Sequence, residues 1–298
     1  MEPRLPAQEL TDPGKSCIVC CALSGVVADR KQCPAIPYTP EEYAAEARRA
    51  WEAGATVVHI HARRPDGTPS YSVDDYRAIS EAVKAACPVL LNFSTGAVDI
   101  STEEKIAPVR QLRPHIAALN MGSMNYAKFH PKKHTFVFEF VFANPFSEIV
   151  ELVRTMKDCG VRPEMECFDT GHVANSYPLI QMGLCPPPRQ YSLILGVTGG
   201  ISPTVGNLLG MVRQLPDGSE WQVIGISDHQ WRLVAAAVAL GGNVRVGLED
   251  NFYVAPDRMA KSNGELVEKA VRMIRDQGRE PASLEQTKAR LGIPDGKP

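Results

Sequence analysis

Short apolar runs recur along the whole chain, and longer segments with helix patterns separate them. The runs are rich in valine, isoleucine and leucine and end near polar residues or glycine, which is typical of buried strands. The pattern predicts eight strands, at residues 17–24, 56–62, 89–95, 116–123, 164–169, 192–199, 221–227 and 243–250.

Start signals mark the helices between these strands. Thr39 precedes Pro40, so a capping hydroxyl stands before a proline in the first helical position. Similar starts occur at Ser72, Ser101 and Ser202. Alternating strands and helices without an internal linker favour a closed parallel (β/α)8 barrel, the TIM-barrel fold, over an open doubly wound sheet. We expect one barrel domain over residues 16–298, after a flexible lead-in at 1–15.

A ninth strand-like run, residues 134–145, exceeds the count of eight. It follows the fourth predicted strand, so we interpret it as an excursion from the barrel, either a hairpin or a contact between copies of the chain. A basic run with Lys128, Lys132, Lys133 and His134 precedes it. Such a run is typical of a solvated loop.

Composition excludes several classes of function. Of the 298 residues 44% are hydrophobic and 22% charged, as in ordinary soluble enzymes. The net charge of -2 gives no electrostatic case for nucleic acid or for a membrane surface. No apolar run approaches the roughly 20 residues that a membrane span needs.

Eight cysteines raise the question of disulfides or a metal site. Cys17 and Cys20 form a C-x-x-C, but no second such pair exists, and strand alternation sends these two to opposite faces. We therefore interpret the cysteines as buried free thiols in a reducing cytoplasm.

Two histidines stand at the end of the second predicted strand, in the sequence TVVHIHAR. His59 and His61 share one strand face, roughly 7 Å apart along the chain. Two imidazoles at this spacing can bind one divalent metal if a third ligand comes from elsewhere; otherwise they are polar residues that bond to neighbours. Because active sites of this fold lie at the carboxyl ends of strands, the metal interpretation is favoured.

The last predicted strand, NVRVGLED, supplies the best third ligand. Arg245 and Glu249 share one face by period two, and Asp250 follows at the strand end. His59, His61 and Glu249 then form a set with open positions, which suits a catalytic metal, with zinc as the default and other divalent transition metals possible. Arg245 and Asp250 form either a structural ion pair or an ionised base beside the metal. A base and a polarised ketone together indicate C–C bond making or breaking beside a carbonyl.

Six motifs in order resemble the β-keto acid cleavage enzymes: HIHAR, NFSTGA, LNMGSMN, ECFDTGH, GVTGG and GGNVRVGLEDN. The resemblance implies a metal-bound barrel, usually with zinc, that converts a β-keto acid and acetyl-CoA into acetoacetate and a new acyl-CoA. It also implies metal binding by His59, His61 and Glu249. Its implied catalytic residues are Asp250 as the base, Arg245 as its helper and Glu166 as an acid nearby.

The same resemblance implies where substrate binds. Ser94 in NFSTGA, with Thr95 and Gly96, is expected to bind the keto acid, and one of Asn120, Gly122 and Ser123 to contribute from the fourth strand. The basic run before residue 134 becomes a possible contact for the CoA phosphates. We further expect a cytoplasmic homo-oligomer, for example a tetramer, without nucleic-acid or membrane partners.

One position departs from the family pattern. Family members that act on an aminohexanoate carry a glutamate in the loop after the first strand, where this chain has Val27 beside Val26. A buried ammonium without a counter-charge is strongly disfavoured, so we expect a substrate without an amino group.

Two other functions use the same residues differently. A metal-dependent barrel hydrolase would activate water with the same ligands and need no CoA. A catalytically inactive scaffold would leave the polar residues at the strand ends unexplained.

Overall fold

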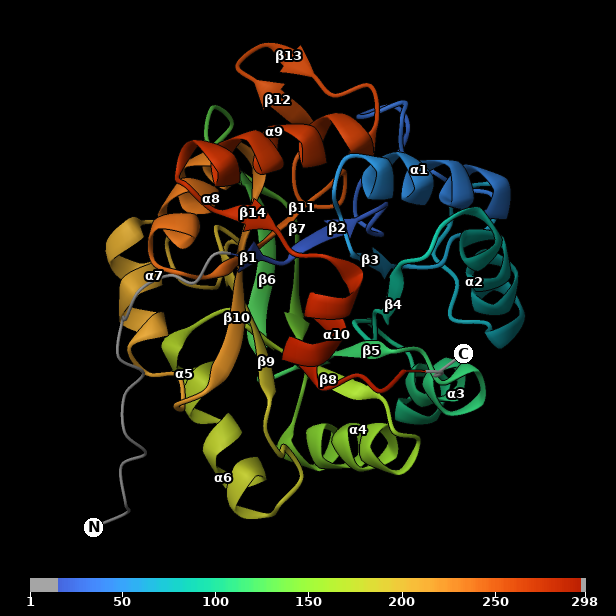
Figure 1. Cartoon of the computed structure of the whole chain (residues 1–298), viewed down its shortest axis with the longest axis vertical. Helices are drawn as coiled ribbons and strands as arrows, with labels where there is room; N and C mark the ends of the chain where they lie inside the picture. The colour runs from blue at the N-terminus through green and yellow to red at the C-terminus, as the bar shows by residue number, and fades with distance from the viewer. Residues whose placement is uncertain (1–15, 296–298) are drawn as a thin grey trace.

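The computed structural model describes residues 16–295, which form a closed parallel barrel with helices around it (Figure 1). The barrel order is β10-β11-β2-β3-β4-β5-β8-β9, and the first and last strands close the ring. The predicted (β/α)8 fold is confirmed. The strands are β2 (Val19–Ala22), β3 (Val57–Ile60), β4 (Leu90–Phe93), β5 (Ile116–Asn120), β8 (Arg162–Cys167), β9 (Arg189–Leu195), β10 (Ser219–Gly225) and β11 (Asn243–Val246).

Helices surround the strands in Figure 1 and bury their apolar faces against the barrel's outer side. They are α1 (Pro40–Glu52), α2 (Val73–Ala86), α3 (Thr102–Leu112), α4 (Phe146–Asp158), α5 (Thr170–Ala174), α6 (Ser176–Gln181), α7 (Val205–Val212), α8 (Gln230–Ala239), α9 (Asn263–Asp276), α10 (Leu284–Leu291) and a 3₁₀ turn at Ser227–His229. Short pairs β1 (Ser16–Cys17) with β14 (Glu280–Pro281) and β12 (Tyr253–Ala255) with β13 (Arg258–Met259) lie outside the barrel.

Three of the four predicted helix starts are confirmed, because the side chain of each predicted cap accepts a backbone N–H of the first turn: Thr39, Ser72 and Ser101. The fourth prediction, Ser202, is wrong by two residues. Thr204 caps α7 instead, and its hydroxyl accepts from the N–H of Asn207 at 3.1 Å.

The barrel interior changes from apolar to polar along its axis. A cluster with Cys20, Val57 and Leu90 fills the end of the barrel where the strands begin. Leu291 in α10 belongs to the same cluster. Two residues further along β3 and β4, the paired residues are His59 and Asn92. Polar side chains inside a barrel need a partner or a function, so chemistry is expected at this carboxyl end of the strands.

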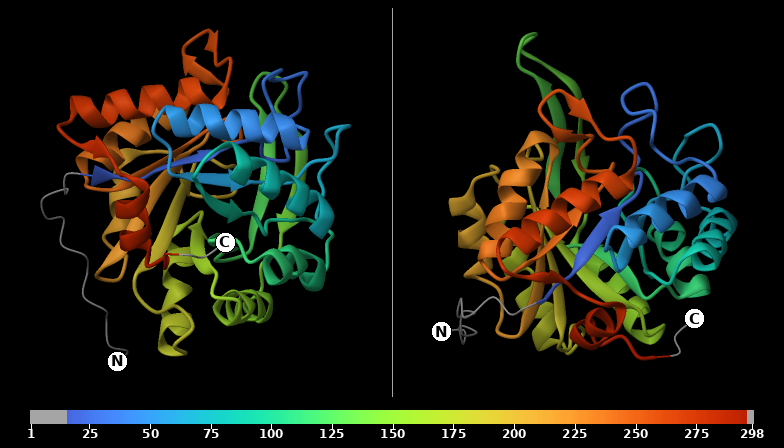
Figure 2. Two further views of the ribbon diagram at one scale, coloured as in Figure 1. Left: turned by 45° about the vertical axis from the view of Figure 1, so that its right-hand side comes forward. Right: turned by 45° about the horizontal axis from the view of Figure 1, so that its top comes forward.

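The ninth strand-like run forms an antiparallel hairpin, which confirms one of its two interpretations. Strand β6 (Met124–His130) pairs with β7 (Thr135–Phe142), and the hairpin projects from the barrel in Figure 2. Its base packs on the barrel mouth: Phe142 joins a cluster with Phe168 and Ile194. The N–H of Ala127 also donates to the carbonyl of Thr198 in the GVTGG loop, at 3.3 Å.

The cysteines are free thiols, as predicted, and all but the half-buried Cys159 are buried. Cys17 and Cys20 pack in different apolar clusters, so their C-x-x-C spacing forms no joint site.

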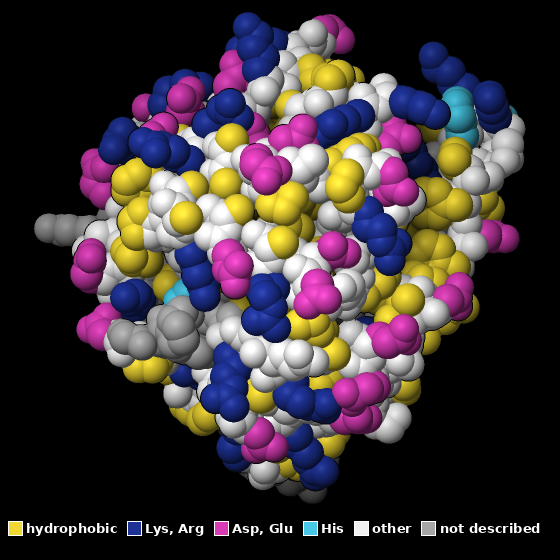
Figure 3. Space-filling model, turned by 90° about the vertical axis from the view of Figure 1, so that its right-hand side faces the viewer, with side chains coloured by type: hydrophobic (Ala, Val, Ile, Leu, Met, Phe, Trp, Pro, Cys, Tyr) yellow, Lys and Arg dark blue, Asp and Glu magenta, His cyan; other side chains and the backbone are white. Residues whose placement is uncertain are grey.

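Within residues 16–295, no helix is long and apolar enough to cross a membrane. One face of the molecule carries acidic and basic side chains interspersed, except at the tip of the arm at the upper right (Figure 3). The expected lead-in, residues 1–15, lies outside the described residues.

Candidate active site

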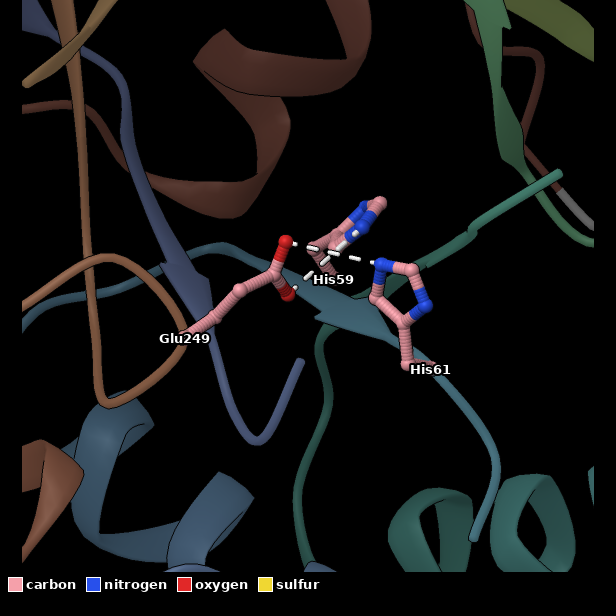
Figure 4. Close-up of side chains that lie close together, drawn as sticks. All are labelled: His59, His61 and Glu249. Atoms are coloured by element: carbon pink, nitrogen blue, oxygen red, sulfur yellow. Dashed lines mark ion pairs between the residues drawn. The ribbon is translucent and has the colours of Figure 1, made fainter. Parts of the chain in front are cut away.

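The three predicted metal ligands meet at the barrel mouth (Figure 4). His59 Nε2 lies 3.8 Å from Glu249 Oε2, and His61 Nε2 lies 3.5 Å from Glu249 Oε1. One possible ligand atom from each residue lies within 4.8 Å of the others. Strands β2 and β3 pair directly, and β11 pairs with β2, so residues about 190 positions apart in sequence become neighbours.

Glu249 reaches this position by a turn, which corrects the prediction of a strand that continues to residue 250. Strand β11 ends at Val246. Gly247 follows with φ +141, and a side chain there would collide with the backbone of Ala22. The N–H of Asp250 then donates to the Gly247 carbonyl at 3.1 Å, which closes the turn. Glycine is needed at 247 because β11 lies too close to β2 for a Cβ.

The protonation states of two of these residues, His59 and Glu249, suit a metal. Burial, with a smaller effect of Arg245, holds the pKa of His59 well below its usual range, so the imidazole is neutral. Burial alone would raise the pKa of Glu249, but the charge of Arg245 beside it holds that pKa well below its usual range. Neutral imidazole and ionised carboxylate are the forms that bind metal. Glu249 Oε2 is buried and accepts no hydrogen bond within the described chain. The set therefore fits a divalent transition metal with two nitrogens and one carboxylate.

Arg63, in the same HIHAR motif, holds the loop at residues 25–28, which lies beside the metal set. The metal set is the group of three ligands His59, His61 and Glu249. Its guanidinium is buried and donates to the carbonyls of Gly25, at 2.8 Å, and Ala28, at 2.5 Å. Sequence reasoning noted this charge without assigning it a role. The available signal was an arginine that directly follows a buried strand.

Gly25, which Arg63 holds, lies directly against a metal ligand. It has φ +57, and an added Cβ would lie 2.7 Å from Cγ of Glu249. We expect Gly25→Ala to weaken metal binding about 10- to 100-fold, because it displaces Glu249. Titration of the metal-free protein with Zn²⁺ against a competing chelator measures this.

Gly218→Ala is the matched control for the backbone strain. Gly218 has φ +68, but nothing lies within 4 Å of its added Cβ. Both variants force alanine into the left-handed region, at about 1–2 kcal/mol each. An equal loss of affinity in the two would contradict a specific contact between Gly25 and Glu249.

A second group of charges surrounds Arg245, which is buried behind Glu249. Its Nε and Nη2 each donate to Asp250 at 3.0 Å, in a bidentate pair. Nη2 also contacts Glu249, and Nη1 lies 3.5 Å from Glu166. The three predicted catalytic residues are thus brought together, with one cation facing three carboxylates.

The carboxylates of this group have different pKa values. Burial raises the pKa of Asp250 to about 6, although Arg245 opposes the rise. Burial raises the pKa of Glu166 to about 8, again against the charge of Arg245. At neutral pH Asp250 is therefore mostly ionised and able to accept a proton, while Glu166 is mostly protonated and able to donate one.

Near Arg245 lies a buried polar network around Glu164, which the sequence alone did not predict. Glu164 is fully buried and accepts hydrogen bonds from Asn92, Ser192 and, at 2.8 Å, Gln222. These four residues come from four strands, β4, β8, β9 and β10. The alternation Glu-Met-Glu at 164–166 was the available signal, because it places Glu164 on the same face as Glu166.

Comparison with known proteins identifies the family of this chain. The sequence matches the profile of the beta-keto acid cleavage enzyme family over residues 16–293. The chain belongs to this family. The resemblance that the six motifs indicated is confirmed.

Members of the family with assigned names align with most of this chain. A 3-keto-5-aminohexanoate cleavage enzyme from Fusobacterium nucleatum is 35% identical over 278 residues, 93% of this chain and 97% of that protein. A 3,5-dioxohexanoate:acetyl-CoA acetone transferase from Paraburkholderia graminis is 30% identical over 276 residues, 86% of this chain and 89% of that protein. Apo ObcA has a TM-score of 0.74 at 21% identity, covering 87% of this chain and 66% of that one, which supports the barrel fold.

The residues predicted to bind the keto acid divide into two groups in this family member. Ser94, Gly96 and Asn120 lie together, since a Cβ on Gly96 would be 3.5 Å from Ser94 Oγ and from Asn120 Nδ2. Thr95 and Ser123 make bonds to backbone: Thr95 donates to a carbonyl of β5 at 2.6 Å, and Ser123 accepts an N–H at 2.7 Å. Ser94 Oγ likewise accepts an N–H, from Gly96 at 3.1 Å, so proximity and not free polar atoms defines the first group.

Val27 lies in the loop after β2, two residues beyond Gly25, with 61% of its surface exposed. The loop position agrees with the sequence comparison, and no carboxylate replaces Val27 within the run Gly25–Ala28. Its contact with substrate stays a prediction.

Proposed function

We propose that this protein transfers carbon between a β-keto acid and acetyl-CoA and releases acetoacetate and a new acyl-CoA. The observation that carries the proposal is the position of the Arg245–Asp250 pair beside the metal set, at the carboxyl end of a family barrel. Incubation with a panel of β-keto acids and acetyl-CoA, with products identified by mass, tests it. A panel that yields no new acyl-CoA would contradict it.

In this proposal Asp250 accepts the proton from the carbon between the ketone and the carboxylate. His59, His61 and Glu249 would hold a divalent metal, which would supply Lewis acidity toward the ketone when bound. Arg245 holds both oxygens of Asp250 toward one side and keeps the carboxylate ionised. Glu166, protonated at neutral pH, donates a proton to a developing oxyanion in this proposal.

The bonds of this transfer balance without an oxidant or reductant. The α-carbon of the keto acid attacks the acetyl carbonyl, and the C–S bond of acetyl-CoA breaks. The released thiolate attacks the ketone carbonyl of the keto acid, and the original C–C bond breaks. The proton taken by Asp250 returns to the acetoacetate carbon. Ser94, Gly96 and Asn120 are the proposed contacts of the keto acid.

We further propose zinc as the metal, the cytoplasm as the location and a homo-oligomer, for example a tetramer, as the assembly. Two imidazoles and a carboxylate are common zinc ligands. Eight free thiols suit a reducing compartment.

The proposed substrate carries no amino group, because Val27 supplies no counter-charge. A tail that covers this exposed valine gains about 0.8 kcal/mol per buried methylene. We expect Val27→Glu to lower kcat/KM for an aliphatic 3-oxo acid, roughly fourfold for each methylene that the variant leaves in water. The ratio of kcat/KM for 3-keto-5-aminohexanoate to that for the plain acid should rise in the same variant.

Val27→Gln is the control, since it has nearly the same size as glutamate and no charge. It should lower kcat/KM for the aliphatic acid without favouring the amino compound. A preference of the unmodified protein for 3-keto-5-aminohexanoate would overturn this assignment of the substrate.

A further inference from the structure

The hairpin β6–β7 turns one of its faces toward the active site. Register pairs Tyr126 with Phe140 and Lys128 with Phe138, so these side chains share that face. The ring of Tyr126 stacks on Phe140 at 5.2 Å and on Phe138 at 6.4 Å between centroids. Together with Phe142 these rings form an aromatic strip: Tyr126, Phe138, Phe140 and Phe142.

The inner end of the strip reaches the proposed keto-acid site. Phe142 Cζ lies 3.6 Å from the Cβ position of Gly96. Tyr126 lies near the catalytic carboxylates: burial, with the charges of Glu249 and Asp250, raises the pKa of its phenol to about 12. A molecule lying along the strip would therefore have one end at the reacting groups.

The outer end of the strip presents two more rings. The register shifts between Lys128 and Phe129, and after this bulge Phe129 pairs with Phe136. Alternation along β7 places Phe136 on the face of Phe138, so the bulge brings Phe129 to the same face. The two rings meet edge to face at 5.5 Å and are 43% and 51% exposed. Exposed rings of this kind are unusual unless something packs on them.

Positive charge gathers around these rings. Lys128, Lys132 and Lys133, here named the lysine cluster, are all exposed, and His130 and His134 accompany them. No aspartate or glutamate occurs between residues 105 and 138, although the whole chain carries a net charge of -2. Figure 3 shows Lys or Arg side chains and a histidine at the end of this arm, above hydrophobic side chains.

We propose that the hairpin binds the nucleotide end of acetyl-CoA, an inference that rests on the proposed function. The lysine cluster binds the phosphates, and Phe129 and Phe136 pack against the adenine. The pantetheine arm lies along the aromatic strip. Its thioester then lies at the keto-acid site, beside Asp250. His130 lies roughly 14 Å beyond Tyr126 at about 3.4 Å per strand residue, a separation that a long linker arm must span. The phosphates match the lysine cluster, the adenine matches the Phe129–Phe136 pair, and the distant thioester matches the inner end of the aromatic strip.

Steady-state kinetics with two thioesters tests the proposal. The variant Lys132→Glu/Lys133→Glu is compared with the unmodified enzyme, with acetyl-CoA or with S-acetylpantetheine, which lacks the nucleotide. We expect KM for acetyl-CoA to rise roughly tenfold or more, from the loss of charge-assisted phosphate contacts. The kcat value and KM for S-acetylpantetheine should change less than about twofold, and added salt should raise KM for acetyl-CoA only in the unmodified enzyme.

Arg77→Glu/Lys84→Glu is the matched control, because it makes the same charge change on the exposed face of α2. It should leave KM for both thioesters unchanged. If KM for acetyl-CoA rises equally in both variants, or if KM for both thioesters rises alike in the hairpin variant, the proposal is overturned. A change of oligomeric state in place of the KM effect would also overturn it and assign the hairpin to an interface.

Calorimetric titration with CoA and with pantetheine separates this proposal from the proposed function, since it needs no turnover. We expect CoA to bind the unmodified protein at least about tenfold more tightly than pantetheine, and the hairpin variant to lose this difference. CoA binding without turnover of any β-keto acid would contradict the proposed function alone. Equal affinity for CoA and pantetheine would contradict the hairpin site alone.

Discussion

Replacing His59 or His61 with alanine is expected to remove the bound metal and abolish turnover while the barrel stays folded. Each variant removes one of three ligands, and the remaining histidine and Glu249 hold a divalent ion far more weakly. The barrel itself is closed by backbone pairing and a large apolar cluster that do not involve these side chains. Metal content per chain after purification, with far-UV circular dichroism, measures both parts of the prediction.

His115→Ala is the control for removing a buried histidine. The N–H of Leu91 donates to His115 Nδ1 at 3.1 Å, on a face of the barrel wall that contributes nothing to the metal set. Loss of this acceptor should cost about 1–3 kcal/mol of stability and leave metal content unchanged. Full metal occupancy in the His59 and His61 variants would refute the ligand assignment.

Asp250→Asn should keep the metal and lose most activity, by about 10²- to 10⁴-fold in kcat. The amide keeps nearly the shape of the carboxylate and can still accept a bond from Arg245, but it cannot take the substrate proton. Metal analysis and kcat on the same preparation separate the two effects. A rate near that of the unmodified enzyme would place the base elsewhere, and Glu166→Gln would then be the next variant.

Arg245→Ala should be as severe as Asp250→Asn, for a different reason. The variant leaves Glu166, Glu249 and Asp250 close together with no cation among them. Removing one partner of a buried ion pair costs about 3–5 kcal/mol, so we expect lower thermal stability as well as lower activity. Asp250→Asn should cause less thermal destabilisation, because it removes a negative charge from the group.

The sequence predicted those features that depend on local periodicity. Alternation placed His59 and His61 on one face, and the apolar runs defined eight strands that the barrel contains. Caps at Thr39 and Ser101 were predictable because the capping bond is made within three residues. Period two along the last predicted strand, together with the barrel fold, also selected Glu249 as the third ligand, and the family motifs implied the same set.

The rest depended on contacts between distant segments. β11 ends at Val246 because Gly247 approaches Ala22 of the neighbouring strand. This contact joins residues far apart in the sequence, so neither residue alone predicts it. Glu164 became interpretable only when β4, β9 and β10 placed Asn92, Ser192 and Gln222 around it. The position of Phe129 beside Phe136 likewise follows from a bulge between Lys128 and Phe129, which the alternating sequence does not reveal.

Acetyl-CoA labelled with ¹³C in both acetyl carbons tests the proposed carbon transfer most directly. The unmodified, metal-loaded protein is incubated with the best β-keto acid from the panel, and both products are analysed by mass. We expect acetoacetate that carries both labelled carbons and a new acyl-CoA whose acyl group carries none. Labelled acetate with free CoA, or products without any new acyl-CoA, would indicate hydrolysis and contradict the transfer.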